Sequence, residues 1–220
     1  MKRFLIALAF LSSFLLAPSA RGEVAIDVKV GYALPTGNIA SATTVTTDRH
    51  GPLANVVSGA IPLEVAARYR FSPKFSAGIY FQYGPAFVAA YSCLASFSCS
   101  ASNVRVGAEA VYGFLPDATF NPWVSVGSGW EWLNQTVDIP ATVAGPGSTQ
   151  KLGLNGWEWF NVQVGADWNL SKMFAAGPYV GFFGGQYSSA TDNTGSNTIA
   201  AANRQFHGWV QLGLKGTVSL

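Results

Sequence analysis

Seven segments of the chain alternate between apolar and polar residues, and the charged residues keep to the polar side of the alternation. An eighth segment, residues 174–187, is rich in glycine and aromatic residues and follows the pattern more weakly. Between residues 24 and 32, for example, Val28 and Val30 alternate with Asp27 and Lys29. Because successive side chains of a β-strand point to opposite faces, this pattern predicts strands with one apolar and one polar face. The segments span residues 24–32, 61–71, 75–83, 103–114, 124–132, 160–170, 174–187 and 209–220.

The connections between these segments alternate between short and long. Residues 72–74, 115–121 and 171–173 form short connections. Residues 34–59, 85–102, 136–156 and 188–205 form long ones that are rich in Ser, Thr, Asn, Ala and Gly. This rhythm is typical of outer-membrane barrels, which have short periplasmic turns and long extracellular loops. We therefore predict an all-β fold, an eight-stranded antiparallel up-and-down transmembrane β-barrel with both termini on the periplasmic side.

The distribution of charge indicates which face meets lipid. Charged residues make up 11% of the chain, whereas ordinary globular domains contain about 25%. A soluble, lipocalin-like barrel would keep its apolar face inside and would need many more charges on its outer face. A Lys or Arg on the lipid face of a membrane barrel costs about 2–4 kcal/mol near the midplane. We therefore predict that the apolar face contacts lipid and that the polar face is enclosed.

Aromatic residues gather near both ends of the predicted strands, as expected for two girdles at the membrane interfaces. The group near the short turns comprises Tyr69, Phe71, Phe75, Tyr112, Phe114, Trp123, Trp168 and Phe174. The group near the long loops comprises Tyr32, Tyr83, Trp130, Trp132, Trp157 and Tyr187.

The N-terminus has the features of a secretory signal peptide. Lys2 and Arg3 precede an apolar run from residue 4 to 16, and small residues follow at 17–20. The run is too short to span a membrane comfortably. We therefore predict a signal peptide at 1–20 and a barrel domain at 21–220. Removing two of the 13 Lys+Arg leaves 11 against 11 Asp+Glu, so the mature chain is neutral and carries no basic surface for nucleic acid.

The enclosed charges are predicted to form ion pairs, because an eight-stranded barrel is just wide enough for its own side chains. If Phe114 lies opposite Pro122 at the short turn, Arg105 lies opposite Glu131. We predict an ion pair there and an interior charge network that fills the barrel; the alternative role for the same charges is a gate or a proton path. The predicted network comprises Glu64, Arg68, Arg70, Arg105, Glu109, Glu131, Asp167 and Lys215.

Two cysteines and two histidines are the other candidates for chemistry. Cys93 and Cys99 lie close together in an exported chain, so a local disulfide is expected. The pair lacks the further ligands of a zinc site, and no motif implies a cofactor. His50 and His207 stand in no recognisable catalytic motif, so we do not expect an enzyme.

The sequence resembles the small outer-membrane barrels of the OmpA/OmpX type over nearly all of the mature chain. The resemblance rests on the signal peptide, the eight alternating segments, the rhythm of the connections and a terminal strand that runs from Leu212 to Leu220. The family usually ends in an aromatic residue that the barrel-assembly machinery recognises, whereas this chain ends in Leu220. The resemblance implies an outer-membrane location, contact with outer-membrane lipid and lipopolysaccharide, and recognition of the C-terminal strand by that machinery.

Two functions follow from these expectations. The first is a structural and surface-interaction role, in which the long extracellular loops bind a ligand. The alternative is a narrow pore for small solutes, since glycines such as Gly107, Gly129 and Gly165 lie on the enclosed face. A lipid-modifying enzyme that depends on His50 or His207 is a third hypothesis.

Overall fold

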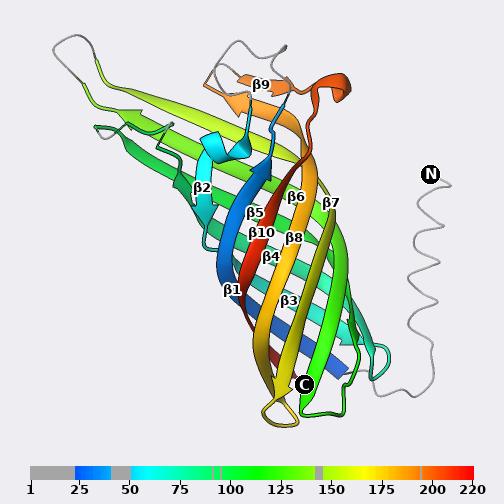
Figure 1. Ribbon diagram of the computed structural model, residues 1–220. Coiled ribbons are helices and arrows are strands. Elements are labelled where there is room, and N and C mark those ends of the chain that lie inside the picture. The colour runs from blue at the N-terminus through cyan, green and yellow to red at the C-terminus, as the bar shows by residue number, and fades with distance from the viewer. Residues whose placement is uncertain (1–22, 41–50, 91, 95, 142–145, 194) are drawn as a thin grey trace.

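Eight long strands close into one antiparallel ring (Figure 1). The computed structural model describes residues 23–40, 51–90, 92–94, 96–141, 146–193 and 195–220, so the predicted signal peptide lies outside the described residues. Each wall strand pairs with its neighbour along the chain, and the last pairs with both the seventh and the first, which closes the barrel. This confirms the predicted fold class. The wall strands are β1 (Glu23–Gly37), β3 (Leu63–Arg70), β4 (Phe75–Val88), β5 (Ser98–Gly113), β6 (Phe120–Ile139), β7 (Ser148–Asn169), β8 (Phe174–Asp192) and β10 (His207–Ser219).

Four shorter elements lie at the end of the barrel with the long connections, which is the extracellular end in an outer-membrane barrel. They are the 3₁₀ turns η2 (Leu53–Asn55) and η3 (Ala201–Asn203) and the strands β2 (Val57–Ala60) and β9 (Gly195–Thr198). β2 leads into β3 through Pro62 and pairs with β1 only at Ala33 and Ala60. Within the described part of the chain, no helix is long and apolar enough to cross a membrane.

Two of the short turns have the same construction. The Ser72 hydroxyl accepts a hydrogen bond from the Phe75 amide at 3.1 Å, and the Ser171 hydroxyl accepts one from the Phe174 amide at 3.1 Å. A serine that bonds its own backbone in this way favours a turn over continued strand. The serines therefore end β3 and β7 and start the return strands.

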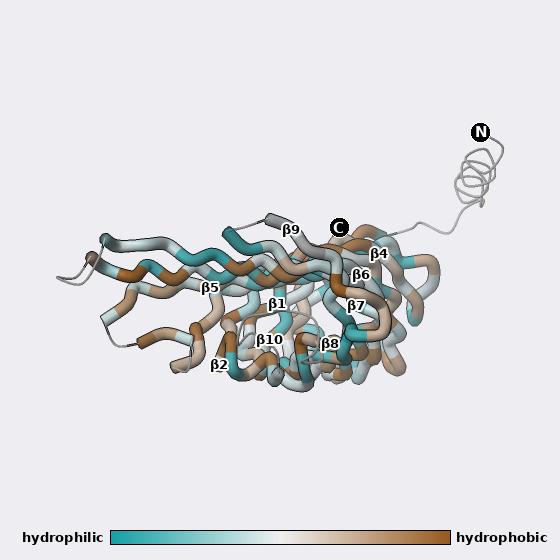
Figure 2. The backbone as a smooth tube through the Cα atoms, turned by 90° about the horizontal axis from the view of Figure 1, so that it is seen from above, coloured by the Kyte–Doolittle hydropathy of each residue, from teal (hydrophilic) through white to brown (hydrophobic). Residues whose placement is uncertain are grey.

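The two faces of the wall differ as the alternation predicts. On β10, Leu212 points outward with 66% of its surface exposed, whereas Lys215 on the other face is 3% exposed. Figure 2 shows hydrophilic and hydrophobic residues following one another along the strands. Exposed apolar side chains in this continuous band are explained if lipid covers them.

The aromatic girdles need two corrections. Trp123 and Tyr187 were assigned to girdles, but they are 3% and 0% exposed and point into the barrel. Both lie on the inward face by strand parity. Each also has a polar group that finds a partner inside: Trp123 donates to Asp167 and Tyr187 donates to Glu131. Other members of the two groups, such as Tyr69 and Trp157, are exposed as predicted.

The predicted loop at 136–156 is wrong for most of its length. β6 and β7 continue as a paired hairpin, with Ile139 opposite Ser148, and β5 runs beside β6 out to Ser98. Figure 2 shows the ends of β5, β6 and β7 reaching well beyond the outline of the barrel. In this extension Leu133 and Leu154 turn inward and are buried, so the apolar face of the strands changes from outside to inside.

A charge placed on the lipid face tests this orientation. Leu212 lies near the middle of β10 and is highly exposed. We expect Leu212→Lys to lower the free energy of unfolding by about 2–4 kcal/mol, because the ammonium group must enter hydrocarbon. Urea titration in phospholipid vesicles measures the change, with Leu212→Met as the control. Equal stability of the two variants would contradict a lipid-facing position.

Candidate functional site

The barrel interior near the periplasmic end holds a cation shared by two carboxylates. Lys29 on β1 donates to Glu64 at 2.7 Å and to Glu109 at 3.3 Å, and it also donates to Gln163 at 3.0 Å. Lys29 and Glu64 are each 2% exposed and Glu109 is 3% exposed. Burying these charges is tolerable because each has an oppositely charged partner within direct contact.

Two further ion pairs lie next to this cluster. Arg68 binds the Asp27 carboxylate through both Nε and Nη2, each at 2.6 Å, which is the bidentate geometry that guanidinium favours. Lys215 contacts Asp167 at 2.7 Å and lies 3.8 Å from the centre of the Trp123 ring. Together with the Lys29 group, these residues form what we call the lower network. Its charged members are Asp27, Lys29, Glu64, Arg68, Glu109, Asp167 and Lys215.

Arg70 does not join the network in which it was predicted. It lies at the periplasmic mouth, where it pairs with Glu23 and donates to Ser219 at 3.3 Å. The Arg70 side chain is 31% exposed, compared with 6% for Arg68. Arg70 is the last residue of β3, so its side chain reaches water rather than the enclosed interior.

A second group, the upper network, is centred on Arg105. The register places Arg105 opposite Glu131, and the two groups lie 3.4 Å apart. On its other side, Arg105 lies 3.3 Å from Glu158. Arg105 is fully buried. Among the described residues, no ion pair joins this network to the lower one, so the single predicted network is two.

Glu131 collects more contacts than the other buried carboxylates. Its Oε1 accepts from Asn103 at 2.6 Å, from Trp209 at 2.9 Å and from Tyr187 at 3.0 Å. His207 lies 3.1 Å from its Oε2. These donors satisfy the carboxylate from three strands, so Glu131 ties β5, β8 and β10 to β6 across the barrel.

His207 is packed inside the upper network. His207 is 1% exposed, contacts Glu131, and stacks on the Tyr187 ring with 3.8 Å between ring centres. A buried imidazole packed in this way has a structural part in the upper network. His50 lies outside the described residues.

The predicted network omitted three buried charges. Asp27 and Lys29 had been placed on the polar face of their strand and belong to the lower network. Glu158 had not been placed on either face. It accepts hydrogen bonds from Tyr80 at 2.5 Å and from Asn161 at 2.7 Å. A bulge between Glu158 and Phe160 adds Trp159 to the outer face. The bulge reverses which residues face inward, so the alternation that begins at Phe160 gives the wrong face for residues before Trp159. Glu158 therefore could not be assigned to the interior from that pattern.

Large side chains, rather than open space, lie next to the interior glycines. A Cβ atom at Gly107 or Gly129 would lie 2.6 Å from the Tyr80 side chain, and one at Gly165 would lie 2.5 Å from Trp123. Tyr80 thus reaches from β4 across the glycines of β5 and β6 to Glu158 on β7. The pore hypothesis took these glycines as a sign of a narrow channel. In the structure, aromatic rings lie against them and fill the space that their missing side chains leave.

The extracellular end of the interior is closed by an apolar cap. Leu53 of η2 is fully buried and packs in a cluster with Val56, Leu133 and Trp209. The complete buried cluster contains Ala33, Ile39, Ala40, Leu53, Val56, Val57, Ala60, Leu133, Leu152, Leu154, Phe183, Tyr187, Ile199 and Trp209.

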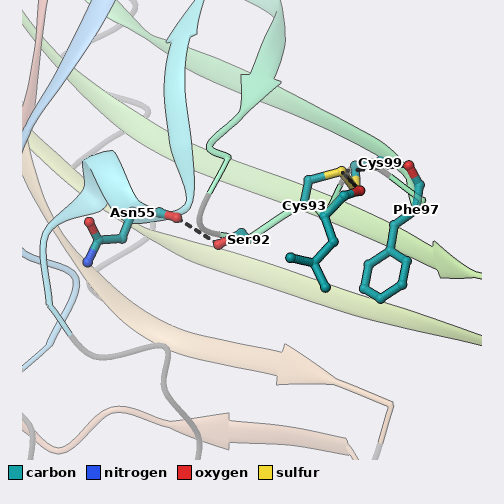
Figure 3. Close-up of a disulfide and its surroundings, with 6 residues drawn as sticks. Asn55, Ser92, Cys93, Phe97 and Cys99 are labelled. Atoms are coloured by element: carbon teal, nitrogen blue, oxygen red, sulfur yellow. Dashed lines mark hydrogen bonds between the residues drawn. A yellow bond between two sulfur atoms is a disulfide. The ribbon is translucent and has the colours of Figure 1, made fainter.

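A disulfide and two hydrogen bonds fasten the segment beside this cap. Cys93 and Cys99 are bonded, which confirms the predicted disulfide (Figure 3). In the same segment Ser92 donates to the Asn55 carbonyl oxygen at 2.6 Å, and the Ala89 amide donates to the Val56 carbonyl oxygen at 3.0 Å. The disulfide therefore holds a segment that is bonded to η2 against β5.

The periplasmic end has a cavity of about 750 Å³. Its wall includes Arg68, Asp167 and Lys215 of the lower network, and its rim includes the short turns at Lys74 and Lys172. The lower network thus borders an open, polar vestibule, whereas the upper network is covered by the apolar cap. Among the described residues, no group of His, Cys, Asp or Glu is arranged to hold a metal ion.

Comparison with known proteins agrees with this architecture. No family model and no curated protein sequence matches the chain. Similar solved structures include a major outer membrane protein from Thermus thermophilus, with a TM-score of 0.56 and 10% identity over 91% of this chain and 100% of that one. OprG from Pseudomonas aeruginosa has a TM-score of 0.54 and 12% identity over 89% and 95%. The outer membrane protein AlkL has a TM-score of 0.51 and 15% identity over 93% and 94%.

At these identities the similarity establishes the fold alone. The chain has the fold of the small outer-membrane β-barrels, with an apolar band outside and its charges inside. It is an integral β-barrel of the outer membrane.

Removing the cation of the upper network tests its energetic role. We expect Arg105→Met to lower the free energy of unfolding by about 3–5 kcal/mol, because it leaves two buried carboxylates without their cation. Adding Glu131→Gln to this variant should restore part of the loss. Urea titration of both variants in vesicles measures the coupling, and additive losses would show that the two residues act independently.

Loss of the disulfide should act locally. We expect Cys93→Ser combined with Cys99→Ser to lower stability by about 2 kcal/mol at most, since the closed loop is short. The larger effect should be faster chymotrypsin cleavage beside Phe97 in the folded barrel. Wild-type protein with intact and with reduced disulfide provides the comparison. Unchanged cleavage would mean that the hydrogen bonds to η2 hold the segment alone.

Proposed function

We propose that the protein is a closed barrel with a structural and surface-interaction role in the outer membrane. The observation that carries the proposal is the continuous filling of the interior. The lower network, the Tyr80 and Arg105 layer and the apolar cap follow one another from the periplasmic vestibule to the extracellular end. A water-filled path would have to break buried ion pairs and displace buried aromatic rings.

The surface available for interaction is the extracellular extension of the sheet. β5, β6 and β7 carry it out of the membrane as hydrogen-bonded strands, so its outer face is held in a fixed shape. A rigid surface loses less conformational entropy on binding than a loose loop of the same composition. Outer-membrane lipid and lipopolysaccharide surround the barrel in this proposal, β10 is the strand that the assembly machinery recognises, and no catalytic step is assigned.

The alternative function is a narrow pore for small solutes. The periplasmic vestibule favours it, since about 750 Å³ of the interior is already open at that end. The two functions differ in whether the layer above the vestibule conducts.

Conductance of the purified barrel in planar bilayers separates the two. We expect no steady openings from the wild-type protein, and openings from Arg105→Ala combined with Tyr80→Ala, which removes two large side chains that contact Glu158. Val126→Ala on the outward face of β6 is the control and should stay closed. Heat-modifiable migration on a gel verifies that each variant is folded. Steady openings of the wild-type barrel would support the pore and overturn the closed-barrel proposal.

A further inference from the structure

The lower network encloses more carboxylates than cations. Its cations are Lys29, Arg68 and Lys215, and its carboxylates are those of Asp27, Glu64, Glu109 and Asp167. All of these side chains are at least nine-tenths buried. If every group were ionised, one negative charge would have no counterion among the described residues. A surplus charge is costly in an interior that excludes water, so the network requires one more positive charge.

The pairing within the network shows where the surplus lies. Arg68 and Lys215 are each balanced by one aspartate. Lys29 instead faces two carboxylates, those of Glu64 and Glu109. Its three N–H donors are all used, because the third is donated to a glutamine amide oxygen. The surplus charge therefore belongs to the pair formed by Glu64 and Glu109.

Glu109 is the less well satisfied member of this pair. Its Oε2 lies 3.3 Å from Lys29, whereas Glu64 lies at 2.7 Å. Its Oε1 is buried and accepts no hydrogen bond. The Arg68 Nε lies 4.0 Å from that oxygen and donates to Asp27 instead. A buried carboxylate oxygen without a donor costs free energy, which protonation of that oxygen would reduce by removing its charge.

The groups around the pair do not supply the missing charge. The titratable, charged or hydrogen-bonding groups that face it are Asp27 on β1, Arg68 on β3, Tyr80 on β4, Gln163 and Asp167 on β7, Tyr179 on β8 and Lys215 on β10. The charged members of this set form the two balanced ion pairs, and the phenols and the amide are uncharged. Neither glutamate of the pair lines the periplasmic vestibule, so bulk water does not screen their charges.

We propose that the Glu64–Glu109 pair is a proton-binding site of the folded barrel and holds one proton through neutral pH, on Oε1 of Glu109. Two carboxylates that share a site titrate together, and one of them takes up a proton when the surroundings cannot balance both charges. The proton comes from water in the vestibule, whose wall includes Arg68 beside Glu109. The site lies inside the barrel, so it does not depend on the surface-interaction role.

The pH dependence of unfolding tests the site in the full-length barrel. A glutamate of the unfolded chain has lost its proton above about pH 5.5, so the folded state carries one proton more. Raising the pH therefore favours unfolding, by about tenfold in the equilibrium constant per pH unit for one proton. Urea titrations in phospholipid vesicles between about pH 5.5 and about pH 7.5 measure this dependence.

Three variants with the same chemical change separate the pair from other titrating groups. We expect the wild-type unfolding constant to rise about 100-fold more over these two pH units than that of Glu109→Gln, which needs no proton. Glu64→Gln removes the other carboxylate of the pair and should behave like Glu109→Gln. Glu23→Gln changes a carboxylate at the exposed periplasmic mouth and should keep the wild-type dependence. Heat-modifiable migration verifies that each variant is folded.

Infrared spectra of the same barrels detect the proton directly, because a protonated carboxyl has a C=O stretching band that an ionised carboxylate lacks. We expect this band at neutral pH to be weaker in Glu109→Gln and Glu64→Gln than in the wild type and in Glu23→Gln. Equal pH dependence of the wild type and both interior variants, or equal bands in them, would overturn the proposal. So would wild-type stability that rises with potassium concentration and loses this rise in Glu109→Gln, since a bound cation would then supply the missing charge.

Discussion

Every charge enclosed by the barrel depends on a partner, and this requirement organises the interior. Lipid outside the wall excludes water, so the backbone must close its hydrogen bonds in a ring. A ring of eight strands leaves room only for side chains. The charges placed inside it must therefore satisfy one another. Lys29 and Arg105 each lie between two carboxylates, and Glu131 in turn draws donors from several strands. These contacts replace the apolar core of a soluble protein.

Polarity changes along the barrel axis in a way that matches the surroundings of each end. The periplasmic end is charged and borders an open vestibule, where water can reach Arg68 and Lys215. The middle is polar but is filled by the Tyr80 side chain, which lies against Gly107 and Gly129. The extracellular end is apolar and is covered by Leu53, which the neighbouring disulfide-linked segment helps to hold. Ion pairs thus close the part of the interior next to water, and packing closes the far end.

The odd or even position of a residue along its strand, which we call strand parity, predicted more of this structure than the type of the residue did. One assumed pairing at a short turn was enough to place Arg105 opposite Glu131, because antiparallel register is constant until a bulge interrupts it. Trp123 and Tyr187 were assigned to the girdles because they are aromatic, although their parity places them inside. Glu158 could not be predicted, since the bulge at Trp159 shifts the parity of β7 and leaves no local trace in the sequence. The division into two networks depends on distances between side chains of non-neighbouring strands, which alternation does not determine.

The misread loop between β6 and β7 has a physical cause that makes it recognisable. Within the membrane the outward residues of β6 are apolar and the inward ones polar, as with Trp132 outside and Glu131 inside. Two residues later Leu133 is inside and Asn134 outside, so the alternation continues with its phase reversed. The reversal follows from the change of solvent. Lipid covers the outer face below this level and water covers it above, while the inner face changes from ion pairs to the apolar cap. A polar segment that keeps period two but reverses its phase is therefore a strand leaving the bilayer, and the position of the reversal marks the membrane boundary on that strand.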